Sequence, residues 1–106
     1  MIKKDLKVAI LGAGAMGCLF GGLLAEKGLD VVLIDIWKEH VDAINKNGLK
    51  MDGHGGDRFI KIKATTNPEI LGKMDAIIIM CKATALEQAL TNAKSIIGDK
   101  TVLMSF

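Results

Sequence analysis

Short apolar runs and helix-spaced apolar residues alternate along this chain. Nearly continuous apolar runs, typical of strands buried on both faces, occur at 8–11, 31–34 and 76–80, and a further strand is expected over 101–104. Between these runs, apolar residues recur every three or four positions, the spacing of a helix with one buried face. This alternation predicts an α/β fold built on an open, mostly parallel sheet with right-handed crossovers.

Three helices are predicted between these strands, over about 15–27, 37–47 and 84–97. The buried face of the first helix is expected to consist of its large apolar residues, which are Met16, Leu19, Phe20, Leu23 and Leu24. Gly21 and Gly22 lie in the middle of this helix, where each costs about 1 kcal/mol relative to alanine. Another element is therefore expected to approach the helix closely at these two glycines.

The segment before the central strand alternates between apolar and charged residues. Ile60, Ile62 and Ala64 are separated by lysines, which predicts one strand over 58–64 with a wet face, as at the edge of a sheet. The glycine-rich stretch 51–57 is expected to be a loop. In chain order, the strand over 58–64 is the third of five. The expected order across the sheet is third, second, first, fourth, fifth. Ligands should bind where this order reverses, which is over the first and fourth strands.

A glycine-rich turn follows the first strand. Residues 12–17 read GAGAMG, and after them come a predicted helix and a second strand closed by Asp35. This is the order of a dinucleotide-binding βαβ unit, so we expect a doubly wound sheet of the Rossmann type. The turn residues predicted to hold the cofactor are Gly12, Ala13, Gly14, Ala15, Met16 and Gly17. The competing interpretation is that these glycines serve packing alone.

If the turn binds a dinucleotide, the three glycines and Asp35 each have a physical role. Gly12 lets the chain turn sharply, Gly14 lets the backbone approach a pyrophosphate, and Gly17 lets the helix lie close to the first strand. The helix N-terminus adds unpaired N–H groups and a positive dipole end. Asp35 lies about 20 residues beyond Gly12, the offset at which a carboxylate binds a ribose 2′-hydroxyl.

Composition narrows the expected partners. The 106 residues carry 14 basic against 12 acidic side chains, a formal charge of +2, which argues against nucleic acid or a membrane surface. No apolar run reaches the ~18 residues of a membrane span. The start of the chain lacks the features of a secretory signal, and the two cysteines match no metal or redox spacing, so a cytoplasmic protein without a metal site is expected. Cys18 is expected to pack, although a helix dipole could lower its pKa, and His40 and His54 are expected to be solvated.

Four segments resemble the ketopantoate reductase (2-dehydropantoate 2-reductase) family. They are GAGAMG with its LFGGLLAEKG helix, then IDIWKEHVDAINKNGL, then ATTNPEIL, and finally Cys81-Lys82-Ala83 followed by LEQAL. Together they span essentially the whole chain but resemble only the cofactor-binding N-terminal part of the family. The resemblance implies NAD(P)H-dependent reduction of ketopantoate, a small 2-oxo acid, to pantoate, on the route to pantothenate and coenzyme A.

The resemblance also implies roles for residues. The turn 12–17 would hold the pyrophosphate, and Lys82 would match the family's lysine beyond the fourth strand, which reaches the cofactor. A cation at the carboxyl end of a buried strand can meet phosphate or ribose oxygens; the alternative is a surface lysine in an ordinary loop. The family's catalytic lysine, Asn-Gly motif and substrate-binding side chains lie further along, in a helical C-terminal domain, so no catalytic residue is assigned here.

Two expectations depart from the family pattern. Members that use NADPH often carry an arginine after the second strand, where this chain has Asp35 and Ile36, so NADH is expected to be favoured, with Lys38 as the one nearby cation. The sheet is also expected to be truncated after about the fifth strand, so that 1–106 is an incomplete cofactor-binding domain lacking its substrate domain. Such a chain would be inactive alone and could form a homo-oligomer through its exposed last strand.

Two other functions fit the opening motif. Nucleotide-sensing regulatory domains of potassium transport systems also begin with a Gly-x-Gly-x-x-Gly turn and carry an acid after the second strand, but they lack ATTNP and a lysine that matches Lys82. Dehydrogenases of the 3-hydroxyacyl or 6-phosphogluconate type share the same opening. The sequence that follows Phe106 would separate the three.

Overall fold

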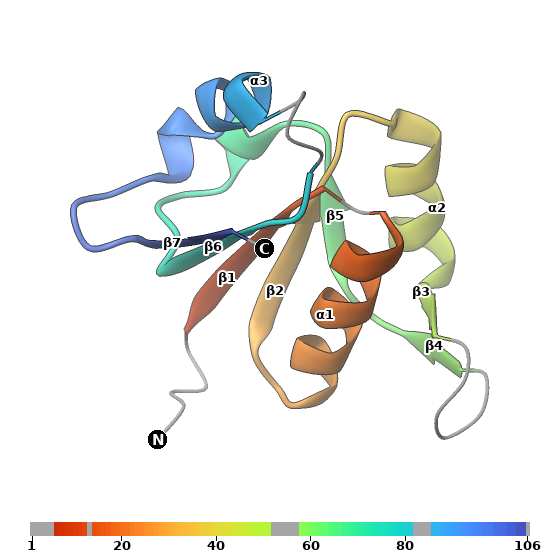
Figure 1. The fold of residues 1–106 in the computed structure, drawn as a ribbon. Coiled ribbons are helices and arrows are strands. Elements are labelled where there is room, and N and C mark those ends of the chain that lie inside the picture. Colours follow the sequence, from red (N-terminus) through yellow and green to blue (C-terminus); the bar gives the residue numbers. More distant parts are fainter. Residues whose placement is uncertain (1–5, 13, 52–57, 82–85, 106) are drawn as a thin grey trace.

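A five-stranded parallel sheet forms the centre of the molecule (Figure 1). The computed structural model describes residues 6–12, 14–51, 58–81 and 86–105. The strands of this sheet, in chain order, are β1 (Lys7–Leu11), β2 (Asp30–Ile34), β5 (Lys63–Thr65), β6 (Ala76–Ile79) and β7 (Val102–Ser105). They lie in the order β5-β2-β1-β6-β7, and each neighbouring pair is parallel. The predicted α/β class and strand order are therefore confirmed.

Two apolar cores lie on opposite faces of this sheet. Alternate residues of β1 divide between them, because successive side chains of a strand point to opposite faces. Val8 and Ile10 belong to the core under α1 (Ala15–Glu26) and α2 (Lys38–Asn47), whereas Ala9 and Leu11 belong to the core under α3 (Leu86–Asn92) and the 3₁₀ turn η3 (Lys94–Ile96). Helices on both faces are what a doubly wound sheet requires.

The segment predicted as one strand over 58–64 is divided in the structure. Its first part, β4 (Arg58–Ile60), pairs antiparallel with β3 (Leu49–Met51) in a separate two-stranded sheet, and its last part, β5, pairs with β2. The prediction of a single strand was therefore wrong. The expected alternation of buried and exposed residues is nevertheless present over 59–64. Alternation with a period of two indicates which side chains are buried, but it does not indicate with which strand each part of the segment pairs. Met51, expected in a loop, belongs to β3, and 52–57 lie outside the described residues.

Most of the large apolar residues of α1 lie outside its buried face, although Leu24 packs against the core as predicted and Phe20 is half-buried. Met16, Leu19 and Leu23 are 56, 42 and 42% exposed, so this part of the predicted face was wrong. The opposite side of the helix carries Gly17, Gly21 and Gly22, and it is these residues that are buried. Helical spacing alone could not distinguish the two sides.

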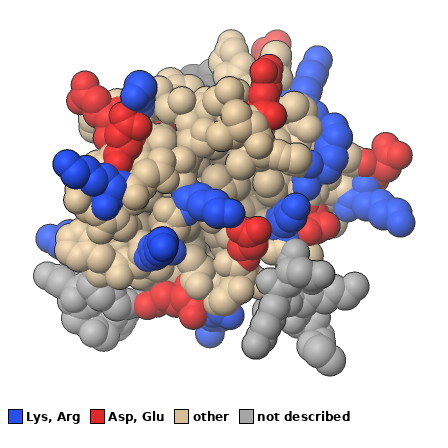
Figure 2. Space-filling model, turned by 180° about the vertical axis from the view of Figure 1, so that it is seen from behind, with Lys and Arg blue, Asp and Glu red and all other residues tan. Residues whose placement is uncertain are grey.

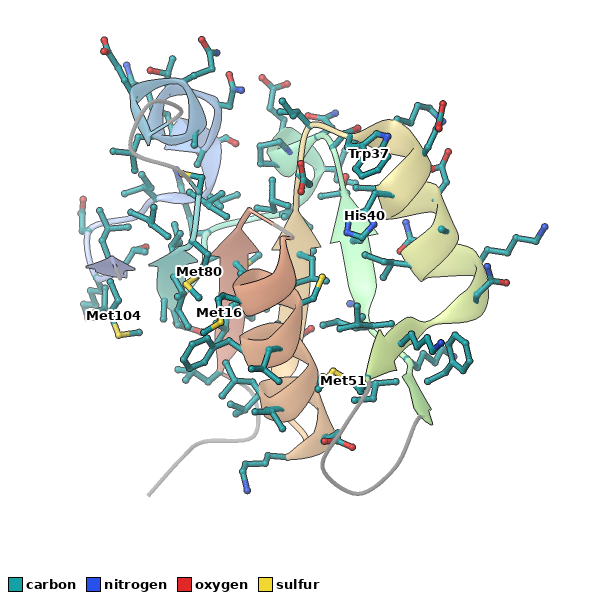
Figure 3. All side chains as sticks on the ribbon, turned by 45° about the vertical axis from the view of Figure 1, so that its right-hand side comes forward. Met16, Trp37, His40, Met51, Met80 and Met104 are labelled. Carbon is teal, nitrogen blue, oxygen red and sulfur yellow. The ribbon has the colours of Figure 1, made fainter. Side chains whose placement is uncertain are left out.

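The two mid-helix glycines of α1 mark where β2 and β3 approach it. A Cβ built on Gly21 would lie 2.7 Å from Leu33 Cδ2, and one on Gly22 would lie 2.5 Å from Met51 Sδ. Met51 is seen beneath the helix in Figure 3. The close approach predicted from these glycines is confirmed, and it explains why the helix turns its small residues inward.

The other helices begin or end differently from the predictions. Trp37, predicted to be the first residue of the second helix, precedes α2 as its N-cap and is exposed, while Val41 and Ile44 within α2 are buried. The third helix is shorter than predicted, since α3 ends at Asn92 and η3 follows, with Ile96 as its fully buried residue. The predicted start of this helix, at 84–85, lies outside the described part of the chain. The short turn η1 (Pro68–Ile70) is capped by the Asn67 side chain, which accepts a hydrogen bond from Glu69 N at 3.1 Å.

Charges of both signs are distributed over the back of the molecule. Figure 2 shows lysine and arginine side chains interspersed with acidic ones around uncharged surface on this face. A surface of a single sign, which would attract a nucleic-acid backbone, is not seen in this view. Within the described ranges, no helix has the length and apolar character needed to cross a membrane.

Candidate functional site

A cavity of about 650 Å³ opens where β1, β2 and β6 end. Its wall includes Gly12 and Gly14 after β1, the segment 35–37 after β2, and Met80 and Cys81 after β6, and α3 closes another side. This is the edge over the first and fourth strands at which the topology predicts a ligand site. Its volume falls in the range of small-molecule and cofactor sites.

Gly12 makes the sharp turn out of β1. Its N–H donates to Ile34 O at 2.8 Å, so the backbone ladder continues up to the turn, and its φ is +101°. A Cβ at this position would lie 3.0 Å from Cys81 N. Both the left-handed backbone and the close approach of the chain after β6 therefore require glycine here.

Gly14 and Gly17 face opposite sides of the turn. Gly14 is the N-cap of α1 and lines the cavity, and a Cβ on it would meet no protein atom within 4 Å. A Cβ on Gly17, by contrast, would overlap the carbonyl oxygen of Gly12 and lie 3.4 Å from Ile10 Cγ2. Gly17 thus allows the helix to pack closely on the end of β1. Gly14 leaves open space beside the N-terminus of the helix, where an anion is favoured.

Asp35 stands on the cavity wall directly after β2. Its N–H donates to Thr65 O at 3.2 Å, and its Oδ1 accepts hydrogen bonds from Ile36 N at 2.7 Å and Trp37 N at 3.3 Å. The turn from β2 into α2 therefore fixes the carboxylate in place. A fixed carboxylate is a strong acceptor for a hydroxyl and repels a second anion.

A small cluster connects α1 to the start of α2. The rings of Trp37 and His40 are stacked with centroids 5.5 Å apart (Figure 3), and His40 Nε2 lies 3.9 Å from Cys18 Sγ. His40 is half-buried, so the expectation that it is solvated was wrong. Burial raises the pKa of the Cys18 thiol, and the charge of Asp35 raises it further. The pKa of Cys18 is therefore not lowered by the helix dipole, and the residue fits the packing role expected of it.

Lys38, the nearby cation of the sequence prediction, is paired elsewhere. Its Nζ lies 2.8 Å from Asp42 Oδ2, one helical turn along the exposed side of α2. This hydrogen bond and the negative charge of Asp42 raise the pKa of Lys38 above its ordinary value. Lys38 is not among the residues that line the cavity.

The structure brings together some of the predicted site residues. Gly12, Gly14 and Asp35 line the cavity, Ala15 begins α1, and Gly17 is buried behind the turn. Met16 is exposed on α1 and does not line the cavity. Ala13, Lys82 and His54 lie outside the described residues. No group of three or more histidine, cysteine or acidic side chains that could hold a metal is found in the described ranges.

Several lining residues were not predicted from the sequence. Trp37, Met80 and Cys81 follow strand ends, and that position is the signal by which they could have been found. Gln88 and Asn92 of α3 carry no such signal, since helical spacing identifies only the residues that face the core.

Comparison with known proteins identifies relatives over nearly the whole chain. A family model described as ketopantoate reductase PanE/ApbA matches residues 8–106. The 2-dehydropantoate 2-reductase of Pyrococcus horikoshii is 48% identical over 99 residues, and that of Streptococcus pyogenes serotype M1 is 38% identical over 97 residues. Each match covers 92% of this chain, but 32% and 31% of those relatives. The chain therefore spans about a third of the length of the curated relatives it matches.

Solved structures share the fold. D-mandelate dehydrogenase, determined as a ternary structure with NADH and anilino(oxo)acetate, is 38% identical with a TM-score of 0.89 over 95% of this chain and 33% of that one. The 2-dehydropantoate 2-reductase of Geobacter metallireducens GS-15 is 30% identical with a TM-score of 0.85, again over 95% of this chain and 33% of the other. With a family match from 8 to 106, this chain belongs to the ketopantoate reductase PanE/ApbA family.

Proposed function

We propose that this chain is the cofactor-binding part of a nicotinamide-dependent oxidoreductase that acts on a small 2-oxo acid. The observation that carries the proposal is the cavity over β1 and β6, lined by Gly12, Gly14 and Asp35. In this proposal the turn 12–17 holds the pyrophosphate at the amino end of α1, and Asp35 binds the adenosine ribose. The neighbour of the same fold that was determined with NADH supports this assignment.

For the complete enzyme we infer the reduction of ketopantoate to pantoate, which the names of the curated relatives support. The likeness to D-mandelate dehydrogenase favours a second candidate, a different 2-oxo acid reduced by the same hydride transfer. Family membership favours both over a potassium-transport regulator or a dehydrogenase of the 3-hydroxyacyl or 6-phosphogluconate type.

The division of labour between domains is also a proposal. Hydride transfer to a 2-oxo acid needs a general acid to protonate the new alkoxide. Of the described residues that line the cavity, only Asp35 and Cys81 can ionise, and Asp35 is assigned to the ribose. We infer that 1–106 form the Rossmann-type cofactor domain and that the general acid and substrate contacts belong to a helical substrate domain, within the length by which the relatives exceed this chain.

We also infer that the protein works in the cytoplasm. Cys18 and Cys81 are not joined in a disulfide, which is the state that a reducing compartment maintains. The relatives' biosynthetic chemistry is compatible with that location.

Cofactor binding can be measured through Trp37, which is the only tryptophan of the chain and lines the cavity. Bound NADH should quench its emission saturably, because tryptophan emission overlaps NADH absorption. Calorimetry on the same samples gives the affinity independently of the optical signal. The variant Trp37→Phe should remove the optical signal while leaving a measurable heat of binding. The absence of both quenching and heat at millimolar NADH would contradict the proposal.

The second measurement is whether the chain oxidises NADH when ketopantoate is present. The 106-residue chain should bind NADH without oxidising it when ketopantoate is added, because the general acid is assigned to the substrate domain. Ketopantoate-dependent loss of NADH absorbance above the rate without protein would show that catalysis does not need a further domain.

Strand β7 suggests self-association. It is an edge of the main sheet, Val102, Leu103 and Met104 are exposed on it, and the strand carries no charged residue. An apolar edge strand of this kind pairs readily with another chain. We expect concentration-dependent association in sedimentation velocity, and Val102→Lys should shift the chain toward monomer. Ile70→Lys, at an exposed apolar position on η1, is the matched control, and a wild-type chain that stays monomeric at all concentrations would refute the expectation.

A further inference from the structure

Helix α3 lies near the ends of β1 and β6 (Figure 1). Two of its amide side chains, Gln88 and Asn92, line the same cavity as Asp35. Gln88 Nε2 donates a hydrogen bond to Asn92 Oδ1 at 3.1 Å. These residues are one helical turn apart and exposed, with half-buried Ala89 beside them on the wall. The bond holds both amides against the same side of the cavity.

The bonded pair keeps donors and acceptors for a ligand, among them Gln88 Oε1 and both N–H groups of Asn92 Nδ2. After the mutual hydrogen bond, Gln88 Oε1 can still accept and Asn92 Nδ2 can still donate. Among the described residues, neither amide has a second side-chain or backbone partner. The pair therefore presents a carbonyl oxygen and an N–H side by side at the cavity edge.

Apolar side chains line other parts of the cavity. Ile36, which is 86% exposed, and the buried Pro68 line the same cavity next to Trp37. A site with apolar walls and a polar edge that combines a donor and an acceptor suits a flat heterocycle. Such a ring would lie between the apolar walls and turn its polar edge toward α3.

We propose that Gln88 and Asn92 recognise the adenine base of the dinucleotide through its 6-amino group and the ring nitrogen N1 beside it. Adenine presents a donor beside an acceptor on that edge, which is the complement of a carbonyl oxygen beside an N–H. The inference rests on the proposed function, because Asp35 as the ligand of the adenosine ribose places the attached base in this part of the cavity and the nicotinamide away from it.

A base analogue tests the hydrogen-bond pattern directly. In reduced nicotinamide hypoxanthine dinucleotide, an oxo group replaces the amino group and the adjacent ring nitrogen carries hydrogen, so the donor and acceptor are exchanged. The wild-type chain should bind NADH about 3- to 10-fold more tightly than this analogue. Calorimetry at fixed ionic strength measures both dissociation constants.

Paired substitutions locate the preference on α3. The double variant Gln88→Met with Asn92→Leu keeps side-chain size and helix propensity but removes both amides. It should weaken NADH binding about 3- to 10-fold and bring the ratio between the two dinucleotides close to 1. Thr91→Ala, on the same helix but not lining the cavity, is the control and should keep the wild-type ratio. Far-UV circular dichroism confirms that each variant is folded.

The outcomes separate this inference from the function on which it rests. If wild type binds NADH and the analogue equally, or if the folded double variant keeps the wild-type ratio, adenine recognition by α3 is overturned while cofactor binding stands. If wild type binds neither dinucleotide, the proposed function fails and the inference fails with it. A preference for NADH that disappears in the double variant alone supports the assignment.

Discussion

The substitution Gly17→Ala should lower the free energy of unfolding by about 3 kcal/mol, which corresponds to a fall in Tm of roughly 10 to 25 °C for a domain of this size. The added Cβ would overlap the carbonyl oxygen of Gly12, which is backbone and cannot rotate aside like a side chain. Gly12 cannot yield either, since it is held at φ +101° against the backbone of Cys81. Alanine gains about 1 kcal/mol in helix propensity, too little to offset the clash. Thermal and urea unfolding of both proteins measure the loss.

Gly14→Ala is the matched change on the other side of the turn. Its Cβ would meet no protein atom within 4 Å, so stability should fall by no more than about 1 kcal/mol, the cost of a poorer N-cap. The same Cβ adds bulk where the pyrophosphate is proposed to lie, and NADH affinity should fall by about 10- to 100-fold through lost contacts to a charged group. Gly72→Ala, also in open space but away from the cavity, should change neither quantity. If Gly17→Ala proved as stable as Gly72→Ala, the packing of α1 on β1 would not depend on that glycine.

The central strands of the main sheet were predictable from the sequence, whereas the buried face of α1 was not. A continuous apolar run such as 76–80 is hard to place other than in the centre of a parallel sheet, and few topologies connect alternating strands and helices. On α1, however, large apolar residues and glycines lie on opposite sides of the same helix. Leu33 of β2 and Met51 of β3 fill the space beside the helix, so the helix approaches with its small side. Apolar spacing gives no sign of that choice.

The residues of the candidate site likewise divide into those that the sequence predicts and those that it does not. Gly12 and Asp35 could be predicted because each directly follows a strand and each has a geometric or chemical requirement of its own. The amide pair of α3 could not, because exposed polar residues on a short helix form no pattern. Their place on the cavity wall depends on how the chain after β6 returns across the sheet, which is a property of the tertiary structure.

The wild-type chain should bind NADH about 10- to 100-fold more tightly than NADPH. Asp35 Oδ1 is held by the N–H groups of Ile36 and Trp37, so the carboxylate cannot easily move away from a 2′-phosphate, which it repels, whereas a 2′-hydroxyl donates to it. Asp35→Asn keeps an oxygen for those N–H groups and removes the charge. It should weaken NADH, strengthen NADPH and bring the ratio near 1. Calorimetry with both cofactors must be run at one ionic strength, because salt screens the repulsion.

Asp42→Asn makes the same change in charge further along α2 and releases Lys38 from its ion pair. If the 2′-phosphate were bound by Lys38, this variant would strengthen NADPH as much as Asp35→Asn does. Because neither Lys38 nor Asp42 lines the cavity, both affinities should stay at their wild-type values. Two results would contradict the role of Asp35: a wild-type preference for NADPH, or an equal gain in NADPH affinity in the two variants. Either result would mean that the surface of α2, and not Asp35, determines which cofactor is preferred. A gain confined to Asp35→Asn assigns the choice to the carboxylate that closes β2.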